Sequence, residues 1–168
     1  MNISSGPLPL VTLEEFTSTD FARLISWVND ENILTQFAGP IFQYPLTDKQ
    51  LYHYLAEPQR RAFKVVHQQR TVGHAEIMLS ESGVAKLCRI LIGDPEDRGK
   101  GLGEQLLSVL IRRCRNKYDV KEIELNVYRW NTPATRCYQK AGFVETDKAT
   151  IDATSSRKWQ TIRMTLKR

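Results

Sequence analysis

The sequence predicts one mixed α/β domain over residues 1–168, with a twisted, mostly antiparallel sheet of about six or seven strands flanked by about four helices on both faces. Three observations favour this class. Strand-like and helix-like segments alternate along the chain, with no repeat or low-complexity linker between them. A glycine-rich run at 98–103 joins a β-type stretch to an amphipathic helix. The length suits one substantial core and is too short for two.

The chain before the glycine-rich run predicts strands and helices in turn. Apolar and β-favouring residues indicate strands at 8–13, 62–67 and 71–79. Apolar residues at helical spacing indicate a helix at 21–28, capped by Ser18, Thr19 or Asp20. Thr47 and Gln50 have the spacing of a capping box, so a second helix is expected to begin there and to run through about Leu55.

The second half predicts a further set of elements. Strands are expected at 85–93, 123–127, 144–153 and 159–166. The residues after the glycine-rich run form an amphipathic helix that becomes basic near its C-terminal end. A shorter helix ends at Gly142, with Thr132 expected as its N-cap and Pro133 as its first residue.

The glycine-rich run itself, Arg98-Gly99-Lys100-Gly101-Leu102-Gly103, is typical of an anion-binding loop. Glycines let the backbone turn sharply and approach a bulky ligand. The first N–H groups of the following helix lack intrahelical partners and carry the positive end of the helix dipole, so they suit a pyrophosphate. The spacing differs from that of a P-loop and of a dinucleotide fingerprint. A plain glycine-rich surface turn is the alternative.

A second motif lies downstream of the loop. Residues 131–143 read N-x-x-A-x-x-x-Y-x-x-x-G-F, directly after the strand at 123–127. The chain resembles the GCN5-related N-acetyltransferase (GNAT) superfamily in the order of these features. They are a strand, the R-G-x-G-x-G loop, a helix, a second strand and then this second motif. The resemblance has its motif support over 84–145. Residues 27–30, Trp-Val-Asn-Asp, are also similar to the start of a branch that includes the RimJ and RimL N-terminal acetyltransferases.

The resemblance implies transfer of an acetyl group from acetyl-coenzyme A to an amine. It implies that the backbone of Leu91, Ile92 and Gly93 pairs with the pantetheine arm of the cofactor, and that Asn131 contacts the same arm. Tyr138 matches the usual general acid, which gives a proton to the departing thiolate; a core aromatic with its hydroxyl at the rim is the alternative. The residues expected around the pyrophosphate are Arg98, Gly99, Lys100, Gly101, Leu102, Gly103 and Glu104.

The general base is a separate question, because the amine must lose a proton before it attacks the thioester. Some relatives carry a Glu on the strand before the Asn motif, but this sequence has Asn126 there. Glu76 is the best remaining carboxylate, on a strand face shared with His74, and an exposed strand residue is its alternative reading. Glu124 is a third option.

The acceptor site is expected in the segment between the first two helices. Its candidate residues are acidic or aromatic: Asp30, Glu31, Phe37, Phe42 and Tyr44. Such groups suit a cationic primary amine, such as a polyamine, an aminoglycoside or a protein N-terminus. Phe37 and Phe42 are equally typical of core residues under a loop.

Composition restricts the function further. Cys88, Cys114 and Cys137 are odd in number and widely spaced, which favours buried thiols in a reducing compartment over disulfides. No histidine pair has ligand spacing, so no metal is expected.

No run approaches the roughly 20 apolar residues of a membrane span, and the N-terminal residues do not resemble a signal peptide. A cytoplasmic protein is therefore expected, and a homodimer is compatible with this interpretation.

Three functional classes remain open on the sequence alone. The favoured one is an acetyl-coenzyme A-dependent amine acetyltransferase. The second is a non-catalytic acyl-coenzyme A sensor on the same fold, which the Asn at 126 keeps in consideration. The third is a nucleic-acid-binding module, because the net charge is +5; interspersed acidic residues and the absence of a nucleic-acid motif make it the least favoured.

Overall fold

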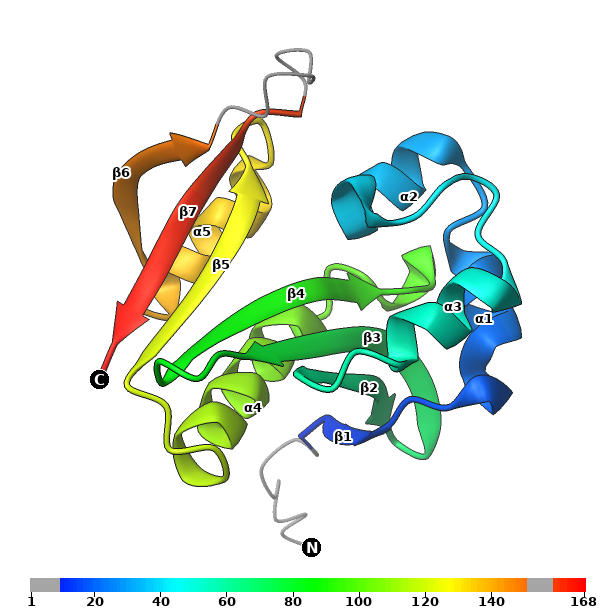
Figure 1. The fold of residues 1–168 in the computed structure, drawn as a ribbon, viewed down its shortest axis with the longest axis horizontal. Helices are drawn as coiled ribbons and strands as arrows, with labels where there is room; N and C mark the ends of the chain where they lie inside the picture. Colours follow the sequence, from blue (N-terminus) through cyan, green and yellow to red (C-terminus); the bar gives the residue numbers. More distant parts are fainter. Residues whose placement is uncertain (1–9, 151–158) are drawn as a thin grey trace, which may run out of the picture.

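In the computed structural model, residues 10–150 and 159–168 are described, and the strands among them form one twisted sheet with the order β1-β2-β3-β4-β5-β7-β6 (Figure 1). β4 and β5 are parallel, whereas all other neighbours are antiparallel. The strands are β1 Thr12–Glu15, β2 Arg60–His67, β3 Arg70–Leu79, β4 Val84–Ile92, β5 Glu122–Tyr128, β6 Val144–Thr150 and β7 Thr161–Lys167. The predicted fold class is confirmed.

Helices cover both faces of the sheet (Figure 1). One core, on the face of α4 and α5, contains apolar side chains of all strands from β1 to β5, of β7 and of α4. The other, on the opposite face, contains side chains of α1, α2 and α3. The helices are α1 Phe21–Trp27, α2 Glu31–Ala38, α3 Asp48–Leu55, α4 Leu102–Asn116 and α5 Thr132–Lys140.

Two elements differ from the sequence prediction in the first half. The opening strand was expected at 8–13, of which 8 and 9 lie outside the described residues; it forms instead at Thr12–Glu15, where it pairs with Phe63–Val66 of β2. Helix α2 was not expected. Its start is fixed by Asp30, whose Oδ1 accepts hydrogen bonds from the N–H groups of Asn32 and Ile33, at 2.8 and 3.2 Å.

The helix caps were predicted with mixed success. Thr47 caps α3 as expected, accepting from the Gln50 N–H at 3.3 Å, but the Gln50 side chain reaches back to Gln43 and Pro45 instead of closing a capping box. The prediction that Thr132 is the N-cap of α5 is wrong. Asn131 is the N-cap, because its Oδ1 accepts from the Ala134 N–H at 3.3 Å and Thr132 is already helical.

The C-terminal pair of strands is confirmed within the described residues. β6 begins at Val144, as expected, and its predicted end at 153 lies outside them. β7 begins two residues later than the expected 159 and continues to Lys167. Its pairing with both β5 and β6 places it inside the sheet, which explains why Ile162 and Met164 are buried.

The central feature of the sheet is the point at which β4 and β5 part. Their pairing covers Val84–Leu87 against Glu122–Leu125 and then stops, and the two strands diverge beyond it toward α2 (Figure 1). On its other side β4 stays paired with β3, with an irregularity opposite His74 and Glu76. Arg89 lies in this irregularity with a φ of 48°, the left-handed region that non-glycine residues rarely adopt. One edge of the second half of β4 therefore has no partner among the described strands.

Candidate active site

The glycine-rich loop leads from β4 into α4. Gly99 and Gly101 have φ values of 75° and 80°, so the turn uses a conformation that suits glycine. Gly101 is the N-cap of α4, and no side chain of the described residues caps the helix, so its first N–H groups are free to bind an external anion. A Cβ added at Gly103 would meet no atom within 4 Å, so the backbone there faces open space.

Side chains of the loop region have mainly structural contacts. The Arg98 guanidinium donates to the carbonyl oxygens of Ile92 and Gly93, at 3.1 and 3.2 Å, and so ties the loop to the end of β4. Leu102 is buried in the core. Glu104 pairs with Lys140 of α5 at 3.0 Å, with both side chains more than half exposed. Of the expected loop residues, the glycines and Lys100 have none of these contacts.

The turn before the loop is anchored to the β2–β3 hairpin. Arg70 donates to both carboxylate oxygens of Asp97, at 3.0 and 2.5 Å, and lies 3.8 Å from Asp94. The hydrogen bond from Arg70 lowers the pKa of Asp97, so this carboxyl is ionised at neutral pH. The hairpin therefore sets the position from which the glycine-rich loop starts.

The end of β4 has a partnered edge and an open edge. Leu91 and Ile92 face His74 and Gly73 of β3, and the Gly93 N–H donates to the Val72 carbonyl oxygen at 2.9 Å. Gly93 also lies directly under the Trp27 ring, which leaves no space for a Cβ there. The residues expected to pair with a pantetheine arm are thus held rigidly from one side.

Tyr138 lies on α5, and Asn131 is the N-cap residue of that helix. The Tyr138 ring is half-buried and packs against Phe143, with ring centroids 6.1 Å apart. Burial raises the pKa of the Tyr138 phenol to about 12, and its hydroxyl has no hydrogen-bond partner among the described residues. The phenol is therefore protonated at neutral pH and its O–H is available to a ligand. Asn131 uses its side-chain oxygen to cap α5.

Glu76 is not the exposed strand residue of the alternative interpretation, because its side chain is fully buried. Arg89 Nε donates to its Oε2 at 2.5 Å and Arg89 Nη2 to its Oε1 at 3.2 Å. Tyr54 adds a hydrogen bond at 2.6 Å and Arg60 one at 3.0 Å. Burial alone would raise the pKa of Glu76, but Arg89 above all, with Tyr54 and Arg60, lowers it. This carboxylate stays ionised and both its oxygens are engaged.

His74 completes this cluster on the α3 side of the sheet. Its Nε2 lies 3.2 Å from the Tyr54 hydroxyl, and its Nδ1 is buried without a hydrogen-bond partner among the described residues. Burial lowers the pKa of His74 to about 4, so the ring is neutral at physiological pH. Because Tyr54 donates its proton to Glu76, the neutral ring must carry its own proton on Nε2.

The sequence did not identify the partners of Glu76. Tyr54, Arg60 and Arg89 come from α3, β2 and β4, and no spacing in the sequence links them. The one signal was Arg89 inside the strand expected at 85–93, since a charged residue in a buried strand needs a partner of opposite charge. Arg60 lies before the strand expected at 62–67 and gave no such signal.

The expected acceptor residues divide into two groups. A hollow of about 350 Å³ is lined by Glu31, Leu34, Thr35, Phe42, Gln43 and Tyr44. Three of the expected residues are therefore brought together. Asp30 is instead the N-cap of α2, and Phe37 is buried in the core against the His74 ring, at 5.6 Å between centroids. The core interpretation thus holds for Phe37.

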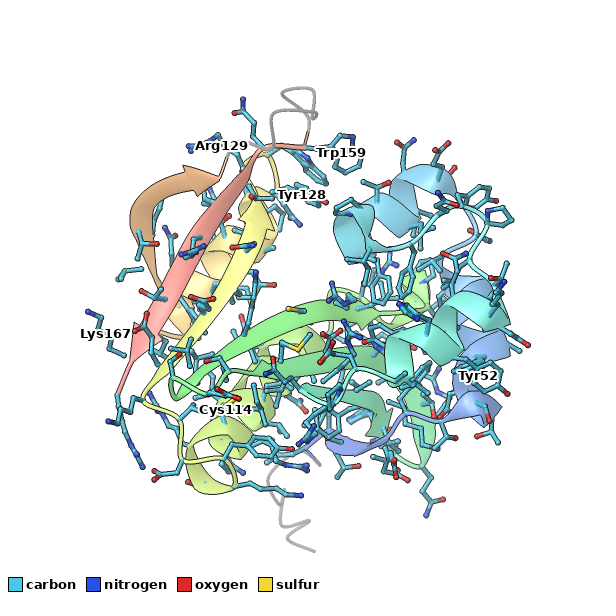
Figure 2. The ribbon with its side chains drawn as sticks, viewed as in Figure 1. Tyr52, Cys114, Tyr128, Arg129, Trp159 and Lys167 are labelled. Atoms are coloured by element: carbon cyan, nitrogen blue, oxygen red, sulfur yellow. The ribbon has the colours of Figure 1, made fainter. Side chains whose placement is uncertain are left out.

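An aromatic cluster that the sequence did not predict lies at the end of β5. Tyr128 stacks on Trp130 with ring planes 1° apart and meets Trp159 edge-on, at the end of β5 that faces α2 (Figure 2). The Tyr128 hydroxyl donates to the carbonyl oxygen of Thr35 at 2.8 Å. This hydrogen bond connects α2 to β5 across the region where β4 and β5 have parted.

The remaining candidate bases lie on β5. Ile123, Leu125 and Val127 point into the core, so Glu124 and Asn126 lie on the opposite face of the strand. Asn126 is exposed one position beyond the last β4–β5 pair, and Glu124 is half-buried within the paired region. Asn126 thus lies at the point where β4 and β5 part, which is called the parting point below.

Family comparison agrees with this arrangement. A model of the Acetyltransferase (GNAT) family matches residues 22–143, and the chain belongs to this family. Among curated relatives, the aminoglycoside N(6')-acetyltransferase type 1 of Klebsiella pneumoniae is 28% identical over 148 residues, covering 79% of this chain and 73% of that protein. The spermine/spermidine N(1)-acetyltransferase of Bacillus subtilis (strain 168) is 38% identical over 64 residues, covering 38% and 41%.

Solved structures share the fold. The aminoglycoside acetyltransferase AAC(6')-Ib with ribostamycin and coenzyme A has a TM-score of 0.78 at 24% identity and covers 95% of this chain and 94% of that one. The spermidine N-acetyltransferase of Vibrio cholerae with coenzyme A and spermine also has a TM-score of 0.78, at 22% identity, with 94% and 95% covered. The protein is an N-acetyltransferase that uses acetyl-coenzyme A as cosubstrate and an amine as acceptor. Of the three functional classes left open by the sequence, these findings favour the acetyltransferase over the non-catalytic acyl-coenzyme A sensor and the nucleic-acid-binding module.

Three further observations apply to the described residues. No helix among them is long and apolar enough to cross a membrane. They contain no group of three or more His, Cys, Asp or Glu side chains that could hold a metal ion. Cys88, Cys114 and Cys137 are free thiols, but only Cys114 is fully buried, whereas all three were expected to be.

Proposed function

We propose that acetyl-coenzyme A binds where β4 and β5 part, with its pyrophosphate at the start of α4. The observation that carries this proposal is the end of β4–β5 pairing at Leu87, which leaves the backbone of Leu91, Ile92 and Gly93 open on one side immediately before the loop. An extended ligand with amide groups, such as pantetheine, can pair with an open strand edge. The N–H groups of Gly99 to Gly103 then meet the phosphates.

The neighbouring side chains have supporting roles in this proposal. Arg98 holds the end of β4 through two carbonyl oxygens, so it fixes the distance between the open edge and the loop. Lys100 is exposed beside the phosphates and Glu104 is held by Lys140. The Asn131 side-chain oxygen is used by the cap, which leaves its amide N–H₂ group to contact the pantetheine arm.

Tyr138 is proposed as the donor to the departing sulfur. Its free hydroxyl and raised pKa support a neutral phenol in the resting enzyme. A free thiol titrates near a pKa of about 8.5, so complete proton transfer from a phenol at about 12 to the thiolate is uphill. Donation of a hydrogen bond to the developing sulfur charge, with later protonation from solvent, is the step that these values support.

The proton of the acceptor amine is proposed to leave through water at the parting point, where Asn126 is exposed and Glu124 lies nearby on the same strand face. Glu76 is less suited to this duty than the sequence suggested. Its lowered pKa and its four hydrogen bonds leave little affinity for another proton. Its role in this proposal is to hold Arg89 and Tyr54 in position.

The acceptor is proposed to enter along α2, over the hollow that Glu31, Phe42 and Tyr44 line. Relatives named for aminoglycosides and for spermine or spermidine make a primary amine the class to test first. The RimJ and RimL branch, a cytoplasmic location and a homodimer remain predictions. Cell fractionation and light scattering of the purified protein test the last two.

The direct test is release of coenzyme A from acetyl-coenzyme A with a panel of amines that includes polyamines, aminoglycosides and peptides with free N-termini. We expect release that depends on both substrates, with mass spectrometry showing one added acetyl group on the amine. Saturable coenzyme A binding with no acetylated product from any amine would contradict the proposed function.

A further inference from the structure

Arg89 connects the buried cluster around Glu76 to the point where β4 and β5 part. It lies two residues beyond the last β4–β5 pair, in the irregular part of β4 with its φ of 48°. Its side chain is 12% exposed, so it is largely desolvated but still reached by solvent. The guanidinium crosses to β3, where it meets Glu76.

The geometry of this ion pair leaves part of the guanidinium open. Nε and Nη2 of Arg89 bond the two oxygens of Glu76, which is the bidentate side-on arrangement. Nη1 has no hydrogen-bond partner among the described residues. The end of the guanidinium, formed by Nη1 and the second proton of Nη2, can therefore bind another planar anion.

The charges around Arg89 do not balance. Arg60 and Arg89 both bond Glu76, while Tyr54 and His74 in the same cluster are neutral. Two guanidinium groups thus share one carboxylate, which leaves a surplus positive charge in a largely buried position. Such a charge is costly unless it is paired, so an anion that reaches Arg89 is stabilised.

The cofactor phosphates do not explain this surplus. Arg89 lies on the face of the sheet covered by α1 to α3, as its contact with Glu76 and its position 5.9 Å from the Tyr54 ring show. The glycine-rich loop leads into α4, which packs on the opposite face (Figure 1). The hollow beside α2 is on the side of Arg89, since its residue Phe42 packs against Tyr54 at 5.4 Å between centroids.

The hollow also does not match a polycation. Of the six described residues that line the hollow, Glu31 alone carries a carboxylate. The neighbouring Asp30 does not line it, and its carboxylate caps α2. An acceptor with several positive charges would require several anionic partners, and it would be repelled by the surplus charge at Arg89.

We propose that the acceptor is an amine that also bears a carboxylate close to the nitrogen, as α-amino acids do, and that the free end of Arg89 binds this carboxylate. The inference rests on the proposed function and narrows its substrate class. Arg89 then places the amine at the parting point, and its positive charge favours the neutral form of the amine that attacks the thioester.

The first experiment uses the parent protein and matched substrates. The twenty amino acids are compared with their amides, with the corresponding decarboxylated amines and with spermidine. We expect kcat/KM for at least one amino acid to exceed that of its amide and of its decarboxylated analogue at least tenfold. Acetylation of amides, simple amines or spermidine as efficiently as of every amino acid would overturn the inference and leave the proposed function intact. Acetylation of no amine would contradict both.

The second experiment tests Arg89 itself. In Arg89→Gln we expect the preference for the amino acid over its amide to fall at least tenfold, mainly through KM of the amino acid, while Arg89→Lys retains part of it. Arg61→Gln, which removes an exposed arginine whose guanidinium donates to the backbone carbonyl oxygens of Pro58 and Arg60, is the matched control. An unchanged preference in a folded Arg89→Gln would overturn the inference. If that variant does not fold, the substrate comparison on the parent protein decides.

Discussion

His74 shows how strongly one environment can change one side chain. It is 1% exposed and packs edge-on against Phe16, and burial lowers its pKa from 6.5 to about 4. In the unfolded chain the same imidazole titrates near 6.5. Between these two pH values the unfolded chain binds a proton that the native protein does not.

Stability should therefore fall as the pH drops from about 6.5 toward 4. A pKa lowered from 6.5 to about 4 corresponds to a loss on the order of 3 kcal/mol in the free energy of unfolding across this window. Urea denaturation at a series of pH values measures this loss. His74→Phe has no ring proton to gain, so its curve should be flatter by that amount. Parallel curves for both proteins would show that folding does not lower the pKa of His74.

Tyr138 is the residue at which chemistry and packing can be separated most cleanly. Tyr138→Phe keeps the ring contact with Phe143 and removes the hydroxyl. We expect kcat to fall roughly ten- to a thousandfold, the usual contribution of a general acid, with little change in the affinity for acetyl-coenzyme A. Steady-state kinetics at saturating substrates measure this, with Tyr118→Phe as a control at the far end of α4. An unchanged kcat would remove Tyr138 from the mechanism.

At the scale of elements, the start of α4 is expected to bind the cofactor through its backbone. Gly103→Leu is the sharpest variant, because Gly103 has open space around it and lacks the positive φ of Gly101, so the apo protein should stay folded. The parent should gain about 2.7 kcal/mol of stability at a coenzyme A concentration of 100 times Kd, and Gly103→Leu should gain almost none.

Ser108→Leu places the same side chain on the exposed side of α4 and serves as the matched control in this thermal-shift measurement. Equal thermal shifts for the parent and Gly103→Leu would mean that the phosphates bind elsewhere.

Helix α2 allows a charge effect to be distinguished from a capping effect. Asp30→Ala should cost about 0.5 to 2 kcal/mol in stability, because two N–H groups lose their acceptor. Asp30→Asn should restore most of that stability, since Asn caps equally well. If Asp30 binds the amine through its charge instead, Asp30→Asn will raise KM for the acceptor as much as Asp30→Ala does. Thermal denaturation and acceptor kinetics on both variants decide between the two.

The elements that sequence reasoning predicted well are those whose signals are local. Gly101 at the N-cap of α4 and Gly142 after α5 both have positive φ, which glycine alone adopts freely, so the pattern of glycines marked both positions. Glu76 could not be placed this way. Its burial depends on Arg60 and Arg89, which meet it only after three strands have paired. Helix α2 is short, and its apolar positions were interpreted as a wall of the site.

At the scale of the whole molecule, the sheet consists of two parts that are joined weakly at its centre. Four residue pairs connect β4 to β5, and beyond them the Tyr128–Thr35 hydrogen bond connects β5 to α2. Tyr128→Phe removes that bond and keeps the stacking on Trp130. We expect faster hydrogen exchange in α2 and weaker acceptor binding, with a change in global stability of only about 1 kcal/mol. Exchange in α2 at the parental rate would show that the bond does not restrain the helix.

The open edge of β4 has a kinetic consequence. Backbone N–H groups between Cys88 and Ile92 that point toward β5 have no partner there among the described strands, so they should exchange with solvent faster than those bonded to β3. A cofactor that pairs with this edge acts as an additional strand and also becomes one wall of the acceptor site. The acceptor would then bind productively only after acetyl-coenzyme A, so the two substrates should add in a compulsory order, and a dead-end acceptor analogue should inhibit uncompetitively against acetyl-coenzyme A.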